Sequence, residues 1–201
     1  EKSVGHNMMT ERIKFVSKLL GLFAATFLFM TGNAMAYEEP SYELIKATDV
    51  YEIRQYEDRL AVQTTQTSGQ NGAFRRLFNY ISGSNESASK IAMTVPVIQS
   101  SDTNSSAMIF FLPKSFTEQS APAPDADNIK LITVKGGFYA VVKYSGRSTN
   151  QNYNKHAALL KEALGHDDII IKGDPMMATY NGPFTLPFMR RNEAMYRVEW
   201  K

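Results

Sequence analysis

The chain of 201 residues contains no cysteine, and that absence removes several classes of site at once. It excludes disulfides, thiolate metal centres and a thiol nucleophile. Histidine is scarce as well, at three residues, and basic and acidic side chains nearly balance, with a net charge of +2. A chain of this length without disulfides must therefore be stabilised by the packing of its core.

The first 36 residues have the pattern of a secretory signal peptide. Three basic side chains precede an apolar segment from Leu19 to Met30, and Ala34-Met35-Ala36 matches a cleavage site. A membrane anchor is the alternative, but the apolar segment is shorter than the ~20 residues that span a bilayer. Cleavage would leave residues 37–201 as a single domain with 18 basic and 18 acidic side chains. We expect an exported protein, periplasmic or secreted, without a nucleic-acid-binding surface or a stable membrane anchor.

The remaining residues divide into two similar halves, about 42–115 and 128–201, on either side of a linker that contains two prolines. In each half, two strand candidates precede an amphipathic helix and two more strand candidates follow it. Val50 and Phe74 each have a counterpart 79 residues later, at Ile129 and Tyr153. Two such units can close their sheets about a pseudo-twofold axis. The pattern predicts an α+β fold with two helices packed on a distorted antiparallel barrel.

The expected elements follow the periodicity of apolar residues. In the first half, strands are predicted over 50–56, 60–67, 91–98 and 107–112, and a helix over 72–81. In the second half, strands are predicted over 129–135, 138–145, 176–180 and 194–200, and a helix over 150–164. Gly136-Gly137 is typical of the turn of a hairpin between two of these strands.

Several short motifs occur in an order that resembles the SOUL haem-binding protein family, over about residues 42–200. They are Tyr51-Glu52-Ile53-Arg54-Gln55-Tyr56, Met93-Thr94-Val95-Pro96, Phe111-Leu112-Pro113, Tyr180-Asn181-Gly182-Pro183 and Arg191-Asn192-Glu193. The resemblance implies the duplicated α+β architecture, which is also similar to the effector-binding domains of GyrI-like proteins. It also implies reversible binding of haem or a related tetrapyrrole.

The resemblance places the tetrapyrrole groove near the first helix and the late loop 180–191. The apolar candidates for its walls are Phe74, Leu77, Phe78, Ile81, Tyr180, Phe184 and Leu186. The candidate cations for the haem propionates are Arg75, Arg76, Arg190 and Arg191. The alternatives are that the loop folds back as a satellite core and that the arginines are ordinary surface residues. Arg191 and Glu193 are also expected to form a structural pair.

An axial iron ligand is hard to find in this sequence. Some SOUL proteins carry a histidine, proposed as a haem ligand, where this chain has Gln55, and glutamine is a poor iron ligand. His156 is the one weak candidate, although a histidine on the flank of a helix is more often at a solvent boundary. Methionines such as Met93 can also ligate iron, but more often they fill apolar space.

The sequence therefore predicts an exported protein that holds haem or another tetrapyrrole non-covalently, for carriage, buffering or scavenging. The alternative is a module for another small apolar molecule or a peptide, with haem binding weak or absent. No nucleophile elbow, phosphate-binding loop or spaced metal-ligand set is present, so we expect no enzyme.

Overall fold

The computed structural model describes residues 37–66, 72–102 and 105–201. The predicted signal peptide lies outside the described residues. Tyr37–Lys201 forms a compact unit, and its three core clusters are built from residues inside it. Within the described ranges, no helix is both long and apolar enough to cross a membrane.

The unit has nine strands, two α-helices and one short 3-10 helix. In chain order they are β1 (Tyr42–Ala47), β2 (Glu52–Tyr56), β3 (Arg59–Gln66), α2 (Gly72–Ile81), β4 (Val97–Asp102), β5 (Ser105–Phe111), β6 (Ile129–Val134), β7 (Gly137–Tyr144), α3 (Asn150–His166), β8 (Met176–Thr179), η1 (Pro187–Met189) and β9 (Asn192–Arg197). Both helices begin where the sequence predicts, and α3 extends through Gly165 to end at His166.

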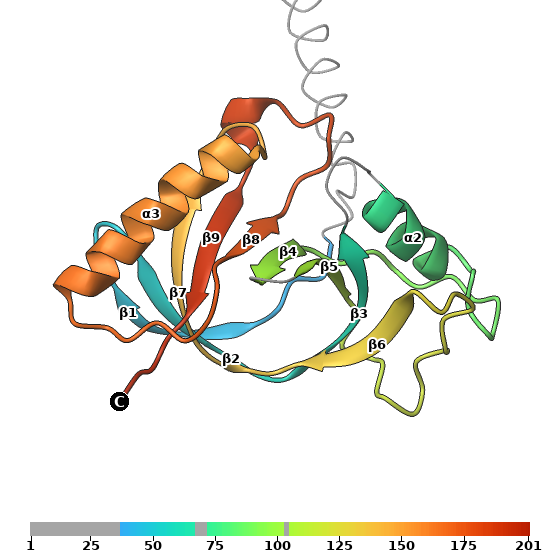
Figure 1. Cartoon of the computed structure of the whole chain (residues 1–201). Helices are drawn as coiled ribbons and strands as arrows, with labels where there is room; N and C mark the ends of the chain where they lie inside the picture. Colours follow the sequence, from blue (N-terminus) through green and yellow to red (C-terminus); the bar gives the residue numbers. More distant parts are fainter. Residues whose placement is uncertain (1–36, 67–71, 103–104) are drawn as a thin grey trace, which may run out of the picture. The chain divides into compact units, whose positions relative to one another are not determined.

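All nine strands join one antiparallel sheet in the order β1-β2-β7-β9-β8-β4-β5-β3-β6. From β2 to β6 the order is symmetric. Each strand of the first half has its counterpart of the second half at the same position counted from the opposite end, which is the expected pseudo-twofold relation. The predicted barrel is wrong in one respect. The sheet curves strongly but stays open, with β1 and β6 at its two ends (Figure 1).

The two halves exchange their leading strands. β2 pairs with β7 of the second half, and β6 pairs with β3 of the first half. The predicted hairpin at Gly136-Gly137 is therefore wrong, because β6 and β7 are joined in sequence but belong to different parts of the sheet. The link needs glycine for another reason: a Cβ at Gly136 would lie 2.3 Å from the carbonyl oxygen of Tyr56. The β2–β3 and β6–β7 links, which each run from one part of the sheet to the other, pass each other at this point.

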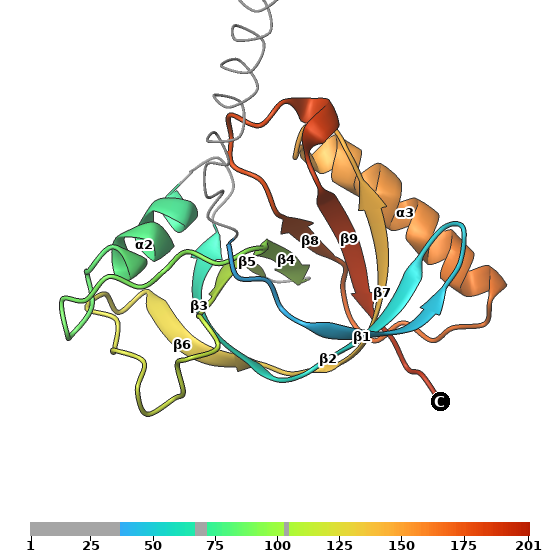
Figure 2. The same cartoon turned by 180° about the vertical axis from the view of Figure 1, so that it is seen from behind.

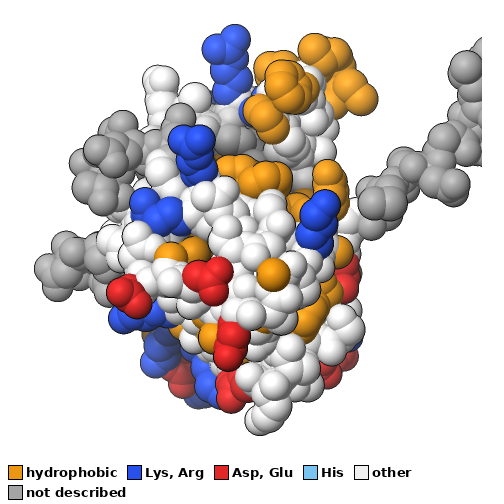
Figure 3. Space-filling view, turned by 90° about the vertical axis from the view of Figure 1, so that its right-hand side faces the viewer, with side chains coloured by type: hydrophobic (Ala, Val, Ile, Leu, Met, Phe, Trp, Pro, Cys, Tyr) orange, Lys and Arg blue, Asp and Glu red, His pale blue; other side chains and the backbone are white. Residues whose placement is uncertain are grey.

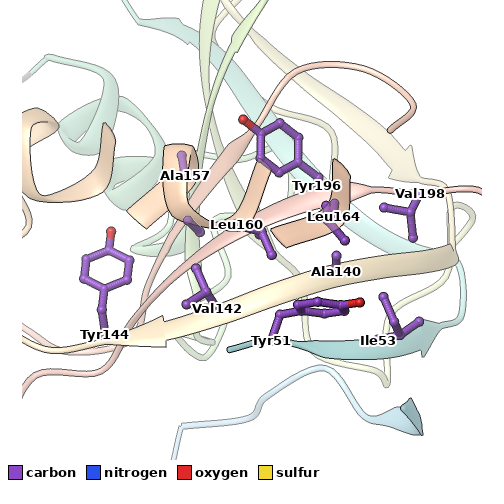
Figure 4. Packing of buried hydrophobic residues seen from close by; sticks show 11 residues of the cluster. Tyr51, Ile53, Ala140, Val142, Tyr144, Ala157, Leu160, Leu164, Tyr196 and Val198 are labelled. Carbon is purple, nitrogen blue, oxygen red and sulfur yellow. The ribbon is translucent and has the colours of Figure 1, made fainter. Parts of the chain in front are cut away.

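Each helix covers the outer face of one part of the curved sheet, as Figures 1 and 2 show from opposite sides. α3 packs through Ala157, Leu160 and Leu164 onto β2, β7 and β9, and Figure 4 shows this cluster. α2 packs through Ala73, Leu77 and Ile81 onto β3 and β5. A third cluster fills the inner face of the sheet between its two parts.

The strand predicted over 91–98 is displaced along the chain. β4 begins only at Val97, directly after the cis Val95–Pro96 peptide, because proline has no N–H to donate to a ladder. Thr94 instead donates its hydroxyl to the Phe111 carbonyl at 2.7 Å. This motif therefore forms an ordered lead into β4. β1, which lies at one end of the sheet, was not predicted from the sequence at all.

Candidate functional site

A groove of about 330 Å³ lies between α2 and the chain that leaves β8. Ligand sites for small molecules have volumes of roughly 300–1,000 Å³ and are mostly apolar, which is the character of this groove. Its lining comprises Tyr37, Phe74, Phe78, Met93, Val95, Val97, Gln99, Met108, Ser148, Thr179, Tyr180, Asn181, Gly182 and Pro183. It thus joins segments from both halves of the chain.

α2 supplies one wall of the groove because its apolar residues cover more than one face. Leu77 and Ile81 turn into the core, where they are 0% and 5% exposed. Phe74 and Phe78, one turn apart on the helix, remain 43% and 47% exposed and line the groove. Their rings lie nearly parallel, with centroids 6.0 Å apart. They therefore present an apolar surface to a ligand.

The chain around the start of β4 separates the groove from a second, smaller cavity. Val95, Val97 and Gln99 face the groove, whereas Pro96 and Ile98 line the inner cavity. This alternation is the ordinary one for extended chain. The inner cavity has a volume of about 60 Å³, well below the size of typical ligand sites. Of the two cavities, the outer groove is the one that can accept a ligand of drug size or larger.

Tyr180 lines both cavities and is held in place by a buried ionic network. Its hydroxyl donates to Glu193 Oε2 at 2.8 Å, and the Arg191 guanidinium lies 3.7 Å from the centre of its ring. Arg54 donates to both carboxylate oxygens of Glu193, at 3.0 and 3.2 Å. The side chains of Arg54 and Glu193 are fully buried. The network fixes one wall of the groove from behind.

The same network fixes the protonation of its members. Burial, followed by the neighbouring charge of Glu193, raises the pKa of the Tyr180 hydroxyl far above its ordinary value. Burial opposes the charge on Arg54, but hydrogen bonds and attraction to Glu193 outweigh it and raise the pKa of Arg54. Tyr180 is therefore a neutral hydrogen-bond donor at neutral pH, and its hydroxyl is engaged by Glu193.

The model of the family described as SOUL heme-binding protein matches residues 37–197, which include every element of the fold. The chain belongs to the SOUL haem-binding protein family. It is 27% identical over 158 residues to Heme-binding protein 1 of Xenopus tropicalis, an alignment that covers 73% of this chain and 82% of that protein. It is 26% identical over 128 residues to Heme-binding protein 1 of Mus musculus, with 60% and 67% covered.

Solved structures resemble this SOUL protein in fold alone. The C-terminal domain of EcmrR aligns with a TM-score of 0.57 at 10% identity, over 79% of this chain and 98% of that domain. A hydrolase from Listeria innocua aligns with a TM-score of 0.54 at 11% identity, over 77% and 94%. These likenesses agree with the predicted α+β class and extend over most of the described residues.

The predicted apolar site residues divide into three groups. Phe74, Phe78 and Tyr180 come together in the groove. Leu77 and Ile81 lie in the core instead and do not line the groove, because α2 needs them to pack on the sheet. Phe184 and Leu186 lie beyond the groove and are 99% and 54% exposed, so the loop does not fold back as a satellite core.

Three of the four predicted arginines already have partners within the protein. Arg76 donates to the Thr64 hydroxyl at 3.0 Å. Arg190 donates to backbone carbonyls of its own loop, and Arg191 forms ion pairs with Glu39 and Glu193. The expected structural pair of Arg191 and Glu193 is thus present. Arg75 is exposed on α2, next in sequence to Phe74.

The histidines of the described part lie elsewhere. The His156 ring stacks on Tyr144 with centroids 4.1 Å apart, and its Nδ1 lies 2.7 Å from the Asn152 carbonyl oxygen. His156 is therefore in a helix-boundary environment, and it does not line the groove. Gln55, on β2, is absent from the lining as well. Among the described residues, no group of three or more His, Cys, Asp or Glu side chains could hold a metal ion.

Sequence reasoning missed the floor and the far wall of the groove. Val95 and Val97 flank a proline, and they were interpreted as parts of a strand without regard to which face they present. Ser148 lies 32 residues before Tyr180 in the chain, yet it lines the same groove because Asn192 binds it: the Ser148 hydroxyl donates to Asn192 Oδ1 at 2.6 Å. The alternation of residues around Pro96 was the one signal that could have found the floor.

Proposed function

We propose that this SOUL protein binds haem or a related tetrapyrrole reversibly in the groove between α2 and Thr179–Pro183. The groove itself carries the proposal, because its walls are apolar and aromatic and come from both halves of the chain. A planar macrocycle can lie against the rings of Phe74 and Phe78, which stand side by side. The shared family with the two Heme-binding proteins 1 supports the identity of the ligand.

Apolar contact, rather than an iron bond, is the main source of affinity in this proposal. No histidine is among the residues that line the groove, and Tyr180 is committed to Glu193. The thioethers of Met93 and Met108 are the soft ligands within the lining, and thioethers in haem sites usually act opposite a histidine. Metal-free protoporphyrin should therefore bind with an affinity close to that of haem.

The role that follows is carriage, buffering or scavenging of the ligand outside the cytoplasm, without chemical conversion. The signal-peptide pattern of the first 36 residues supports export. The lack of a recognisable catalytic set in the sequence favours a binding protein. Reversible binding suits a groove that is open to solvent along one side, since release then requires no unfolding of the core.

Titration of the chain from Tyr37 onward with hemin and with protoporphyrin IX tests the proposal. We expect saturable changes in the Soret band for both ligands. Phe78→Asp should weaken both by about tenfold or more, because it places a charge against the macrocycle. His156→Ala, which changes a residue outside the groove, is the matched control and should leave both affinities unchanged.

Two results would count against this function. Loss of the Soret change in His156→Ala, with the fold intact, would show that an axial histidine is required. Absence of any saturable change with either ligand would favour the alternative prediction from the sequence, in which the groove binds a different apolar molecule or a peptide. Native mass spectrometry of protein purified from its own cells would then show which molecule copurifies.

A further inference from the structure

The end of the loop that follows the groove carries four large hydrophobic side chains in solvent. Phe184, Leu186, Phe188 and Met189, here called the apolar tip, are 99%, 54%, 74% and 63% exposed. Single exposed hydrophobic residues are common on protein surfaces, but a group of this kind marks an interaction site. Figure 3 shows hydrophobic side chains gathered toward the top of the molecule in this view.

The backbone behind the apolar tip is held in position. Arg190 donates through Nε to the Thr185 carbonyl at 2.8 Å and through a second nitrogen to the Pro183 carbonyl. The N–H of Gly146 donates to the Pro187 carbonyl at 2.8 Å, which ties the tip to the turn before α3. Pro187 also begins the short helix η1. The hydrophobic side chains are thus presented outward by an ordered loop.

The surroundings of the apolar tip are basic. The segments that meet at this end of the molecule are α2, residues 145–155 and residues 180–191, and none of them contains an aspartate or a glutamate. Together they carry six cations: Arg75, Arg76, Arg147, Lys155, Arg190 and Arg191. Of these six, Arg191 forms ion pairs with Glu39 and Glu193. The acidic side chains visible in Figure 3 lie in its middle and lower parts.

We propose that the apolar tip docks reversibly on an anionic lipid surface. Aromatic and aliphatic side chains at a protruding loop can enter the boundary between headgroups and acyl chains, and neighbouring Arg and Lys side chains are attracted to anionic headgroups. The balanced charge of residues 37–201 does not oppose this, because the three segments at the end that carries the tip contain six of the 18 cations and no aspartate or glutamate. A protein partner would be expected to offer acidic groups to these cations. The experiment below distinguishes a protein partner from a lipid surface.

Docking in this orientation has a consequence for the groove. Pro183 lines the groove and is the immediate neighbour of Phe184 in the tip. The opening of the groove would therefore lie close to the lipid surface, from which an apolar ligand could be collected or to which it could be delivered. This consequence rests on the proposed function, whereas docking itself does not require any ligand in the groove.

Flotation with vesicles tests the docking directly. The protein would be the chain from Tyr37, so that the apolar segment Leu19 to Met30 contributes nothing. The vesicles would be phosphatidylcholine alone or phosphatidylcholine with phosphatidylglycerol. We expect the protein to float with the anionic vesicles, and raised salt to release part of it. Phe184→Ser with Phe188→Ser should lower the partition coefficient by about tenfold or more.

Two further variants complete the design. Leu44→Ser with Ile170→Ser removes two exposed hydrophobic side chains outside the tip, 53% and 57% exposed, and should leave partition unchanged. Arg147→Gln with Lys155→Gln, which removes two of the six cations, should reduce the preference for anionic over neutral vesicles. Circular dichroism would confirm that every variant is folded.

The proposal is overturned if the wild-type chain fails to float with anionic vesicles. It is also overturned if the variant that lacks both phenylalanines floats as well as the variant at Leu44 and Ile170. Either result would favour a protein, rather than a lipid surface, as the binding partner of the apolar tip. The outcome is independent of the titration with hemin, because flotation is measured without any tetrapyrrole.

Discussion

Glu193 is the residue on which the inner wall of the groove depends most directly. It is 0% exposed and accepts hydrogen bonds from Arg54, Arg191 and Tyr180. A buried ion pair contributes little net stability when it is compared with an apolar pair of the same shape, but the loss of one partner leaves an uncompensated charge. Arg54 is that remaining charge here, and the partly exposed carboxylate of Glu52, 2.7 Å away, compensates it in part.

Glu193→Gln should therefore lower the free energy of unfolding by about 3 kcal/mol, the lower end of the range for breaking a buried ion pair, because the buried Arg54 guanidinium loses the Glu193 carboxylate and keeps that of Glu52. Glu199→Gln is the matched control. Glu199 pairs with Lys172 at the surface, where both side chains are about half exposed, and its loss should cost at most about 1 kcal/mol. Urea unfolding measures both changes, and equal losses for the two variants would contradict the role assigned to Glu193.

At the scale of single residues, the sequence predicted which side chains form an ion pair better than it predicted which way side chains point. The pairing of Arg191 with Glu193 was expected from the motif Arg191-Asn192-Glu193 and is present. The exposure of Phe74 and Phe78 could not be separated from the burial of Leu77 and Ile81, because all four fall on adjacent faces of one helix. Which of them meets the sheet depends on how α2 is placed by tertiary packing.

Among the elements, the link between β6 and β7 shows most clearly what local sequence signals leave open. Two adjacent glycines between apolar strands favour a hairpin, and yet β6 and β7 pair with different partners. Gly136 is required by the close passage of a second chain segment at Tyr56, which is a long-range contact that no local pattern contains. In contrast, both helices were predicted to start at the correct residues, because their signals are local.

Gly136→Ala tests that contact. The added Cβ would lie 2.3 Å from a backbone oxygen, so that one of the two links must move, and we expect a loss of about 1–3 kcal/mol in the free energy of unfolding. Gly165→Ala, in α3, is the matched control, since a Cβ added there would have no neighbouring atom within 4 Å. That change should instead stabilise the protein by up to about 1 kcal/mol. Destabilisation of the same size in both variants would argue against the crossing of the links.

For the whole molecule, the duplication predicted from the sequence is real, but the halves are not independent units. Each part of the sheet contains one strand from the other half, β2 in one and β6 in the other. The prediction of a barrel failed because the sequence repeat specifies equivalent strands without specifying which half they join. The resulting sheet is open, with β1 and β6 at its two ends.

Separation of the halves should therefore abolish folding. A chain cut within the linker 120–127 yields two fragments, each of which lacks one strand of its own part of the sheet. We expect each fragment alone to show the narrow amide dispersion of an unfolded chain, and an equimolar mixture to recover the native spectrum. A dispersed spectrum and cooperative unfolding for either fragment alone would contradict the strand exchange.

Binding of a tetrapyrrole in the groove between α2 and Thr179–Pro183 is the central claim, and amide chemical shifts test it most directly. The measurement is a titration of the ¹⁵N-labelled chain from Tyr37 with metal-free protoporphyrin IX, which avoids paramagnetic broadening. We predict saturable shifts that cluster at Phe74 to Phe78, Val95 to Val97 and Thr179 to Gly182. Shifts confined to the inner cavity or to α3 around His156, or no saturable shifts, would contradict the account.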